Sequence, residues 1–93
     1  MLDKQTDRLF DSVTQQSIIK LGRLIARKRK VLGWTLDETA NYTGISKSLI
    51  SALENKRAKS APSMNILTRL IRVLDISPNE FNSCFYWGLD NEK

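Results

Sequence analysis

The stretch that decides the fold runs from residue 33 to residue 55 and reads GWTLDETANYTGISKSLISALEN. Thr35 and Glu38 have the spacing of a capping box, in which each side chain binds the backbone amide of the other residue. Ser46 can cap a second helix in the same region. Gly44, between these two start signals, suits a backbone turn with positive φ. The stretch therefore predicts two short helices joined by a tight turn.

The residue types of the second short helix, predicted at Lys47–Glu54, fall on two faces. Ile50 and Leu53 are spaced to anchor it against a core, and Ile45 is an apolar plug for the turn. Ala40 is small where the two helices should cross. The remaining side chains are free to enter a DNA major groove. This pattern describes a helix-turn-helix at about residues 35–54.

Helical patterns also flank this motif. Ile18, Leu21, Ile25 and Leu32 form an apolar stripe that predicts a helix from about Gln16 to Leu32. A fourth helix begins after Ser63, with an inward set of Ile66, Leu67, Leu70, Ile71 and Leu74. A second capping box, Ser77 to Glu80 with Pro78 between, opens a fifth helix at about Pro78–Phe85. No strand-like alternation of useful length occurs, so the predicted fold class is all-α with five helices.

The chain ends are less patterned. Leu2, Leu9, Phe10 and Val13 fit either an extra N-terminal helix or an arm. We expect an N-terminal extension at residues 1–14, a DNA-binding domain at residues 15–87 and a C-terminal tail at residues 88–93.

Composition excludes several functions. The chain has 93 residues, of which 41 % are hydrophobic and 27 % charged, as in one small globular domain. It contains no His and 1 Cys, which excludes a His-based triad, a zinc cage and an internal disulfide. No stretch is apolar enough to cross a membrane and none has the form of a signal peptide, so we expect a cytoplasmic protein.

Positive charge is concentrated in the middle of the chain. Residues 20–59 carry 10 basic and 3 acidic side chains, whereas the whole chain has a net charge of +5. An excess of this kind favours a polyanionic partner.

The same central residues resemble the lambda-repressor/Cro-like helix-turn-helix family, also called XRE. The likeness extends from about Ile18 to Phe81 and includes the small residue, the Gly turn and the Glu-Asn ending in register. It implies a compact five-helix bacterial or phage regulator that binds a palindromic operator as a dimer. The sequence departs from the family pattern at Leu36, Thr39, Thr43 and Lys56, where Gln, Leu, an apolar residue and Gly are common.

The resemblance also implies roles for individual residues. The positions that would read bases are Ser46, Lys47, Ser48, Leu49, Ser51 and Ala52. The positions that would bind phosphates are Thr35, Asn55, Lys56, Arg57, Lys59 and Arg27. Arg29 matches an arginine that commonly pairs with the residue at Glu54; contact of Glu54 with cytosine is the weaker interpretation.

The predicted recognition helix offers few side chains for direct readout. Residues 47–53 contain no Gln, Asn or Arg. Lys47 could bind guanine, and Leu49 or Ala52 could contact a thymine methyl group. We therefore expect selectivity to depend also on backbone fit and on DNA shape.

Aromatic residues gather near the C-terminus. Phe81, Phe85, Tyr86 and Trp87 either complete the core of the monomer or form a homodimer interface. A dimer would bury apolar surface that so short a chain covers poorly on its own. The single cysteine, Cys84, reads as a small, partly buried apolar group.

The leading hypothesis is a sequence-specific DNA-binding transcriptional regulator that acts on double-stranded DNA as a homodimer, without cofactor, metal or small-molecule substrate. Asp37 and Glu38 could contact polymerase, so the sequence leaves activation and repression open. The alternative is an antitoxin or another protein-interaction module that neutralises a protein partner and autoregulates through DNA binding. An enzyme is disfavoured, because the sequence has no phosphate-binding loop and Asp37 and Glu38 diverge on a helix.

The substitution Ile50→Asp tests the predicted register of the recognition helix. A carboxylate forced into the core should unfold the domain, so the variant should lose its cooperative thermal transition in circular dichroism. A variant that stays folded and only loses DNA binding would place Ile50 on the surface instead.

Overall fold

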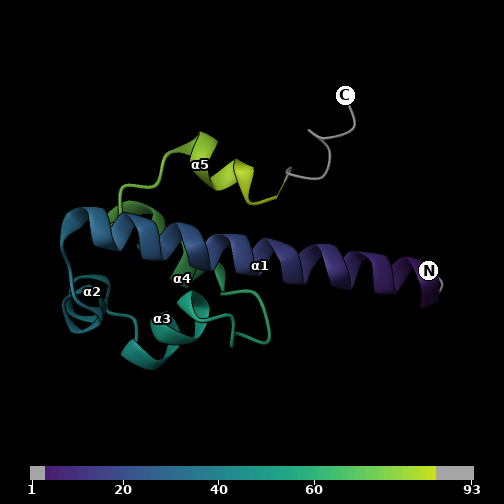
Figure 1. Ribbon diagram of the computed structural model, residues 1–93, viewed down its shortest axis with the longest axis horizontal. Helices are drawn as coiled ribbons and strands as arrows, with labels where there is room; N and C mark the ends of the chain where they lie inside the picture. The colour runs from purple at the N-terminus through teal and green to yellow at the C-terminus, as the bar shows by residue number, and fades with distance from the viewer. Residues whose placement is uncertain (1–3, 86–93) are drawn as a thin grey trace.

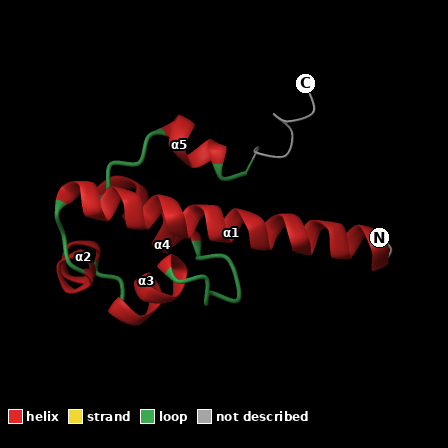
Figure 2. Ribbon diagram, viewed as in Figure 1, coloured by secondary structure: helices red, strands yellow, loops and turns green. Residues whose placement is uncertain are grey.

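A computed structural model describes the backbone of residues 4–85 and the side chains of residues 14–85. In this part of the chain the structure has five helices and no strand, which confirms the all-α fold class (Figures 1 and 2). The helices are α1 (Lys4–Leu32), α2 (Leu36–Thr43), α3 (Lys47–Glu54), α4 (Met64–Val73) and α5 (Pro78–Ser83).

The first helix is longer than predicted. It begins at Lys4 rather than at about Gln16, so the expected N-terminal extension continues the same helix as far as the backbone is described. The N-terminal part of α1 extends past the other helices (Figure 1). Leu2 and the side chains of Leu9, Phe10 and Val13 lie outside the described residues.

The core lies between α1, α3 and α4. Its most completely buried side chains include Ile25 of α1, Ile50 and Leu53 of α3, and Leu70 and Leu74 of α4 and its C-cap. These are positions that the apolar patterns placed inward. Leu32 is the exception, because it is 42 % exposed at the end of α1, where the helix has passed beyond the core.

Helix α1 crosses α3 at very short range, and Gly22 makes this possible. A Cβ atom added at Gly22 would lie 1.9 Å from the carbonyl oxygen of Leu53. Backbone atoms cannot move aside as the end of a side chain can, so a residue larger than glycine would push the two helices apart.

The predicted capping residues all occur. Thr35 accepts a hydrogen bond from the Glu38 amide, and the Glu38 carboxylate accepts one from the Thr35 amide. Ser63 caps α4, and Ser77 with Glu80 forms the second capping box. Helix α5 ends at Ser83, two residues before the predicted end.

Helix α2 has two buried threonines at positions where the family that the sequence resembles commonly has apolar residues. Thr39 and Thr43 are 0 % and 3 % exposed. Each hydroxyl donates to the carbonyl oxygen four residues earlier, over 2.9 Å for Thr39 and 2.7 Å for Thr43. Because both donors are satisfied, the core tolerates these polar atoms. Thr39 is therefore fully buried in α2, whereas its neighbour Ala40 is only partly buried.

The exchange Gly22→Ala tests the close packing of α1 on α3. The new methyl group would overlap backbone, so the free energy of unfolding should fall by at least about 2 kcal/mol, despite the higher helix propensity of alanine. Urea denaturation measures this change.

Gly33→Ala is the matched control. Gly33 has φ +74 and no atom within 4 Å of an added Cβ. Its substitution carries only backbone strain and should cost about 1 kcal/mol. A smaller loss at Gly22 than at Gly33 would contradict the proposed role of the contact.

Candidate nucleic-acid interface

Helices α2 and α3 form the predicted two-helix motif. Gly44 joins them with φ 70 and donates its amide to the Ala40 carbonyl, which closes the end of α2. Ser46 caps α3 by accepting a hydrogen bond from the Leu49 amide. Ile45 is 3 % exposed and fills the turn from inside. These interactions fix the angle at which α3 leaves the turn.

An arginine outside the motif also holds the turn. Nη1 of Arg69, in α4, lies 3.3 Å from the Thr43 carbonyl oxygen and 3.4 Å from that of Gly44. A positive charge at the C-terminal end of α2 also interacts favourably with the helix dipole. Local sequence patterns do not show this role of Arg69, because the contact joins residues about 25 positions apart.

The outward side of α3 is the candidate reading face. It comprises the six positions that the family resemblance assigned to base contacts: Ser46, Lys47, Ser48, Leu49, Ser51 and Ala52. The first three side chains are exposed, whereas the other three are half-buried. Leu49 also packs against the core, so less of it faces outward than expected. Ile50 and Leu53 hold the opposite side of α3, with 0 % and 1 % exposure.

Lys47 projects from the first turn of α3 beside an acidic side chain of α2. Its Nζ atom lies 3.3 Å from Oδ1 of Asp37, and both side chains are largely exposed. The pair is placed on the same side of the motif as the candidate reading face.

Three polar side chains meet near the C-terminal end of α3. The Ser51 hydroxyl accepts hydrogen bonds from Nδ2 of Asn55, at 3.2 Å, and from Nη2 of Arg57, at 2.9 Å. The structure thus brings one expected base-reading residue together with two expected phosphate-binding residues. A hydroxyl has two acceptor lone pairs and one donor hydrogen, so Ser51 keeps its donor for a further partner.

Three further expected phosphate-binding residues lie at the two ends of the motif. Thr35 is exposed at the start of α2, where it caps the helix. Lys56 and Lys59 are exposed in the loop after α3. Lys56 has φ 61, a backbone conformation that glycine adopts with less strain than lysine does. Lysine in place of the Gly that is common in the family therefore adds a positive charge and some backbone strain.

Arg29 and Glu54 form a partly buried ion pair between α1 and α3. Nε and Nη2 of Arg29 bind the two carboxylate oxygens over 2.7 and 2.9 Å, and Nη1 binds the Trp34 carbonyl over 2.7 Å. The hydrogen bond with Glu54 raises the pKa of Arg29. The Glu54 side chain is 8 % exposed. Arg29 therefore occupies the Glu54 carboxylate, which the weaker interpretation of the sequence assigns to a contact with cytosine.

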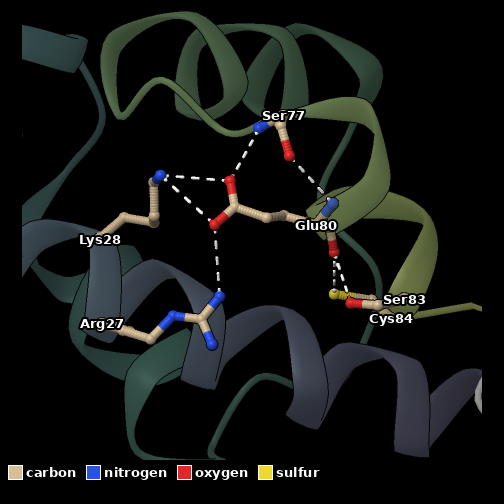
Figure 3. A network of polar contacts seen from close by, with 6 residues as sticks. All are labelled: Arg27, Lys28, Ser77, Glu80, Ser83 and Cys84. Atoms are coloured by element: carbon tan, nitrogen blue, oxygen red, sulfur yellow. Dashed lines mark hydrogen bonds and ion pairs between the residues drawn. The ribbon is translucent and has the colours of Figure 1, made fainter.

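Arg27 lies elsewhere. Its Nη2 is 3.4 Å from Oε2 of Glu80 in α5, and Lys28 binds both carboxylate oxygens of the same residue (Figure 3). Helices α5 and α3 lie on opposite sides of α1 (Figure 1). Arg27 thus faces α5, on the side of α1 away from α3, and its expected contact with phosphate stays a prediction.

The C-terminal candidates divide between core and surface. Phe81 packs against the core, and its ring centroid lies 4.7 Å from that of Phe85. Phe85 is 39 % exposed. Tyr86 and Trp87 lie outside the described residues. Cys84 is 2 % exposed, and burial raises the pKa of its thiol.

The described residues also bear on metal binding and on membrane crossing. Within that part of the chain, no group of three or more His, Cys, Asp or Glu side chains is arranged to hold a metal ion. None of the described helices is long and apolar enough to cross a membrane.

The fold and the two-helix motif define a helix-turn-helix protein of the XRE, or lambda-repressor-like, class. The chain belongs to this family, because a family model described as helix-turn-helix matches residues 25–81.

Two relatives carry the name HTH-type transcriptional regulator SinR. The protein of Bacillus licheniformis is 35 % identical over 77 residues, which cover 77 % of this chain and 68 % of the relative. The protein of Bacillus subtilis (strain 168) is 35 % identical over 57 residues, 61 % of this chain and 50 % of the relative. No solved structure matches the chain.

The hydrogen bonds that Glu80 accepts from Ser77 and Lys28 predict a loss of stability in acid. A backbone hydrogen bond from Ser77 and the bond from Lys28 lower the pKa of Glu80 from 4.5 to about 2 in the folded protein. Because the folded pKa is the lower one, this stabilisation is present above about pH 4.5 and is lost as the pH falls toward 2.

The variant Glu80→Gln measures this contribution. Denaturation at several pH values should show wild type to be more stable than the variant at pH 6, with the difference shrinking toward pH 2. Parallel pH profiles of the two proteins would rule out the assigned cause.

Proposed function

We propose that the protein is a sequence-specific DNA-binding transcriptional regulator that places α3 in the major groove. One observation carries the proposal: α3 is anchored from behind by Ile50 and Leu53, at 0 % and 1 % exposure, while Ser46, Lys47 and Ser48 stand exposed on its other side. A helix with this division of faces can enter a groove about 12 Å wide without losing its own support. The names of both relatives favour the same function.

The charges around α3 support contact with the phosphate backbone. Lys56, Arg57 and Lys59 follow the helix in one loop and are exposed. Arg57 is held toward α3 by the Ser51 hydroxyl, which reduces the entropy that a phosphate contact would cost. Thr35 and Asn55 complete the proposed phosphate contacts around α3. Arg27 faces α5, so a phosphate contact of Arg27 would lie apart from this group.

The candidate reading face offers mainly hydrogen-bond donors. The Lys47 ammonium can only donate, and the acceptor lone pairs of Ser51 are already used by Asn55 and Arg57. Glu54 is occupied by Arg29. Guanine presents two acceptors, O6 and N7, in the major groove, so an operator with guanine opposite Lys47 fits this face best.

We further propose that the protein binds a palindromic operator as a homodimer. Phe85 lines a mainly apolar cavity of about 190 Å³ together with Leu21 of α1, Leu67 of α4 and Pro62 of the loop before α4. An open apolar cavity of this kind favours burial by another chain. The antitoxin alternative would use the same face for a different protein, and the mass of the purified assembly distinguishes the two.

Selection of bound fragments from random DNA by the purified full-length protein tests the proposed function. We expect one enriched motif with two half-sites related by a two-fold axis and centred about 34 Å apart. Enrichment of no motif, with equal binding to all fragments, would refute sequence-specific recognition.

Two lysines should separate base reading from phosphate binding. Lys47→Ala should weaken operator binding by about 1–3 kcal/mol and relax the preference at one base position. Lys59→Ala should weaken binding to operator and scrambled DNA alike and reduce the slope of log affinity against log salt by about 0.9. Salt titrations on both duplexes measure these effects, and an unchanged preference in Lys47→Ala would overturn the assignment of the reading face.

A further inference from the structure

The ammonium group of Lys47 already has an acidic neighbour in the free protein. Asp37 is the second residue of α2 and Lys47 the first of α3, so their ion pair spans the turn between the two helices. The side chains are 72 % and 56 % exposed, and a pair this open to water adds little to folding stability. Because Lys47 belongs to the candidate reading face, the pair affects instead which groups of DNA Lys47 can bind.

A base edge can bind Lys47 while the pair is kept. An ammonium group has three donors, and one carboxylate oxygen occupies one of them. The other two donors suffice for O6 and N7 of a guanine. Because a base edge carries no net charge, the Asp37 carboxylate does not repel it strongly.

A phosphate is a less favourable partner for the same lysine. Any phosphate oxygen that binds Nζ of Lys47 must approach a carboxylate oxygen that lies 3.3 Å from that atom. Like charges at such separations are well within the screening length of about 10 Å at 0.1 M salt. Asp37 therefore opposes contact of Lys47 with the backbone more than contact of Lys47 with a base.

We propose that Asp37 is a specificity-determining residue, which holds the Lys47 ammonium toward base edges and weakens its binding to phosphates of non-operator DNA. This inference rests on the proposed function, because it assumes that α3 enters the groove. The acidic side chain thus lowers total affinity for DNA while raising the ratio of specific to non-specific binding.

The variant Asp37→Asn tests the proposal, with Asp75→Asn as the matched control. Both exchanges remove one negative charge. Asp75 is exposed in the turn after α4, outside the candidate interface, and its φ of 55 is one that asparagine also adopts. The probes are the duplex most enriched by wild type in the fragment selection and a scrambled duplex of equal length and composition.

We expect Asp37→Asn to bind the scrambled duplex about threefold to fivefold more tightly than wild type does, the range of an exposed ion pair. Binding to the selected duplex should change less than twofold, so the specificity ratio falls. Asp75→Asn should change both affinities by the same small factor and leave the ratio intact. Circular dichroism confirms that both variants are folded.

A double-mutant cycle shows whether Asp37 acts through Lys47. In the Lys47→Ala background, Asp37→Asn should have no more effect than Asp75→Asn on either duplex. An equal effect of Asp37→Asn with and without Lys47, or an unchanged specificity ratio, would overturn the inference. If wild type itself does not distinguish the two duplexes, the proposed function fails first, and the two failures are thus separable.

Discussion

The close packing of α1 on the backbone of α3 is the constraint on which the rest of the structure depends. At Gly22 the helices are so near that a single added carbon would overlap the Leu53 carbonyl. Around this point Ile25, Ile50 and Leu53 are almost completely removed from water. Burial of this kind orients α3, since the side that contacts α1 determines which side remains for a partner.

Polar contacts then fix α3 at both ends. Ser46 acts at its start as the N-cap, and the Arg29–Glu54 pair acts at its end. A second ion pair, Asp37–Lys47, lies beside the start of α3. The two ion pairs differ in environment. The Arg29–Glu54 pair is mostly shielded, and Arg29 also donates to the Trp34 carbonyl, so the pair helps to position the helix. The Asp37–Lys47 pair is open to solvent and available to a ligand.

The basic charge of residues 20–59 does not form one surface. Arg27 and Lys28 bind Glu80 on the α5 side of α1, and Arg29 is turned toward α3. Lys47 and the loop that follows α3 supply cations near the outward side of that helix. The net charge of a segment therefore overstates the charge that a polyanionic partner meets, because Arg27 and Lys28 face Glu80 whereas Arg29, the next residue of the same helix, faces Glu54.

The local structure of this protein can be predicted from short-range sequence patterns. The capping boxes at Thr35 and Ser77, the turn at Gly44 and the inward positions Ile50 and Leu53 follow from contacts within a few residues or from helical periodicity, and all are present. The roles of several other residues follow only from how the helices pack. Gly22 is required because α3 crosses α1 at that point. Arg27 forms an ion pair because α5 places Glu80 beside it. The Ser51 hydroxyl accepts a hydrogen bond because the loop after α3 returns Arg57 to it. These roles depend on distances between segments that helix periods and capping signals do not encode, since each is set by how whole helices pack.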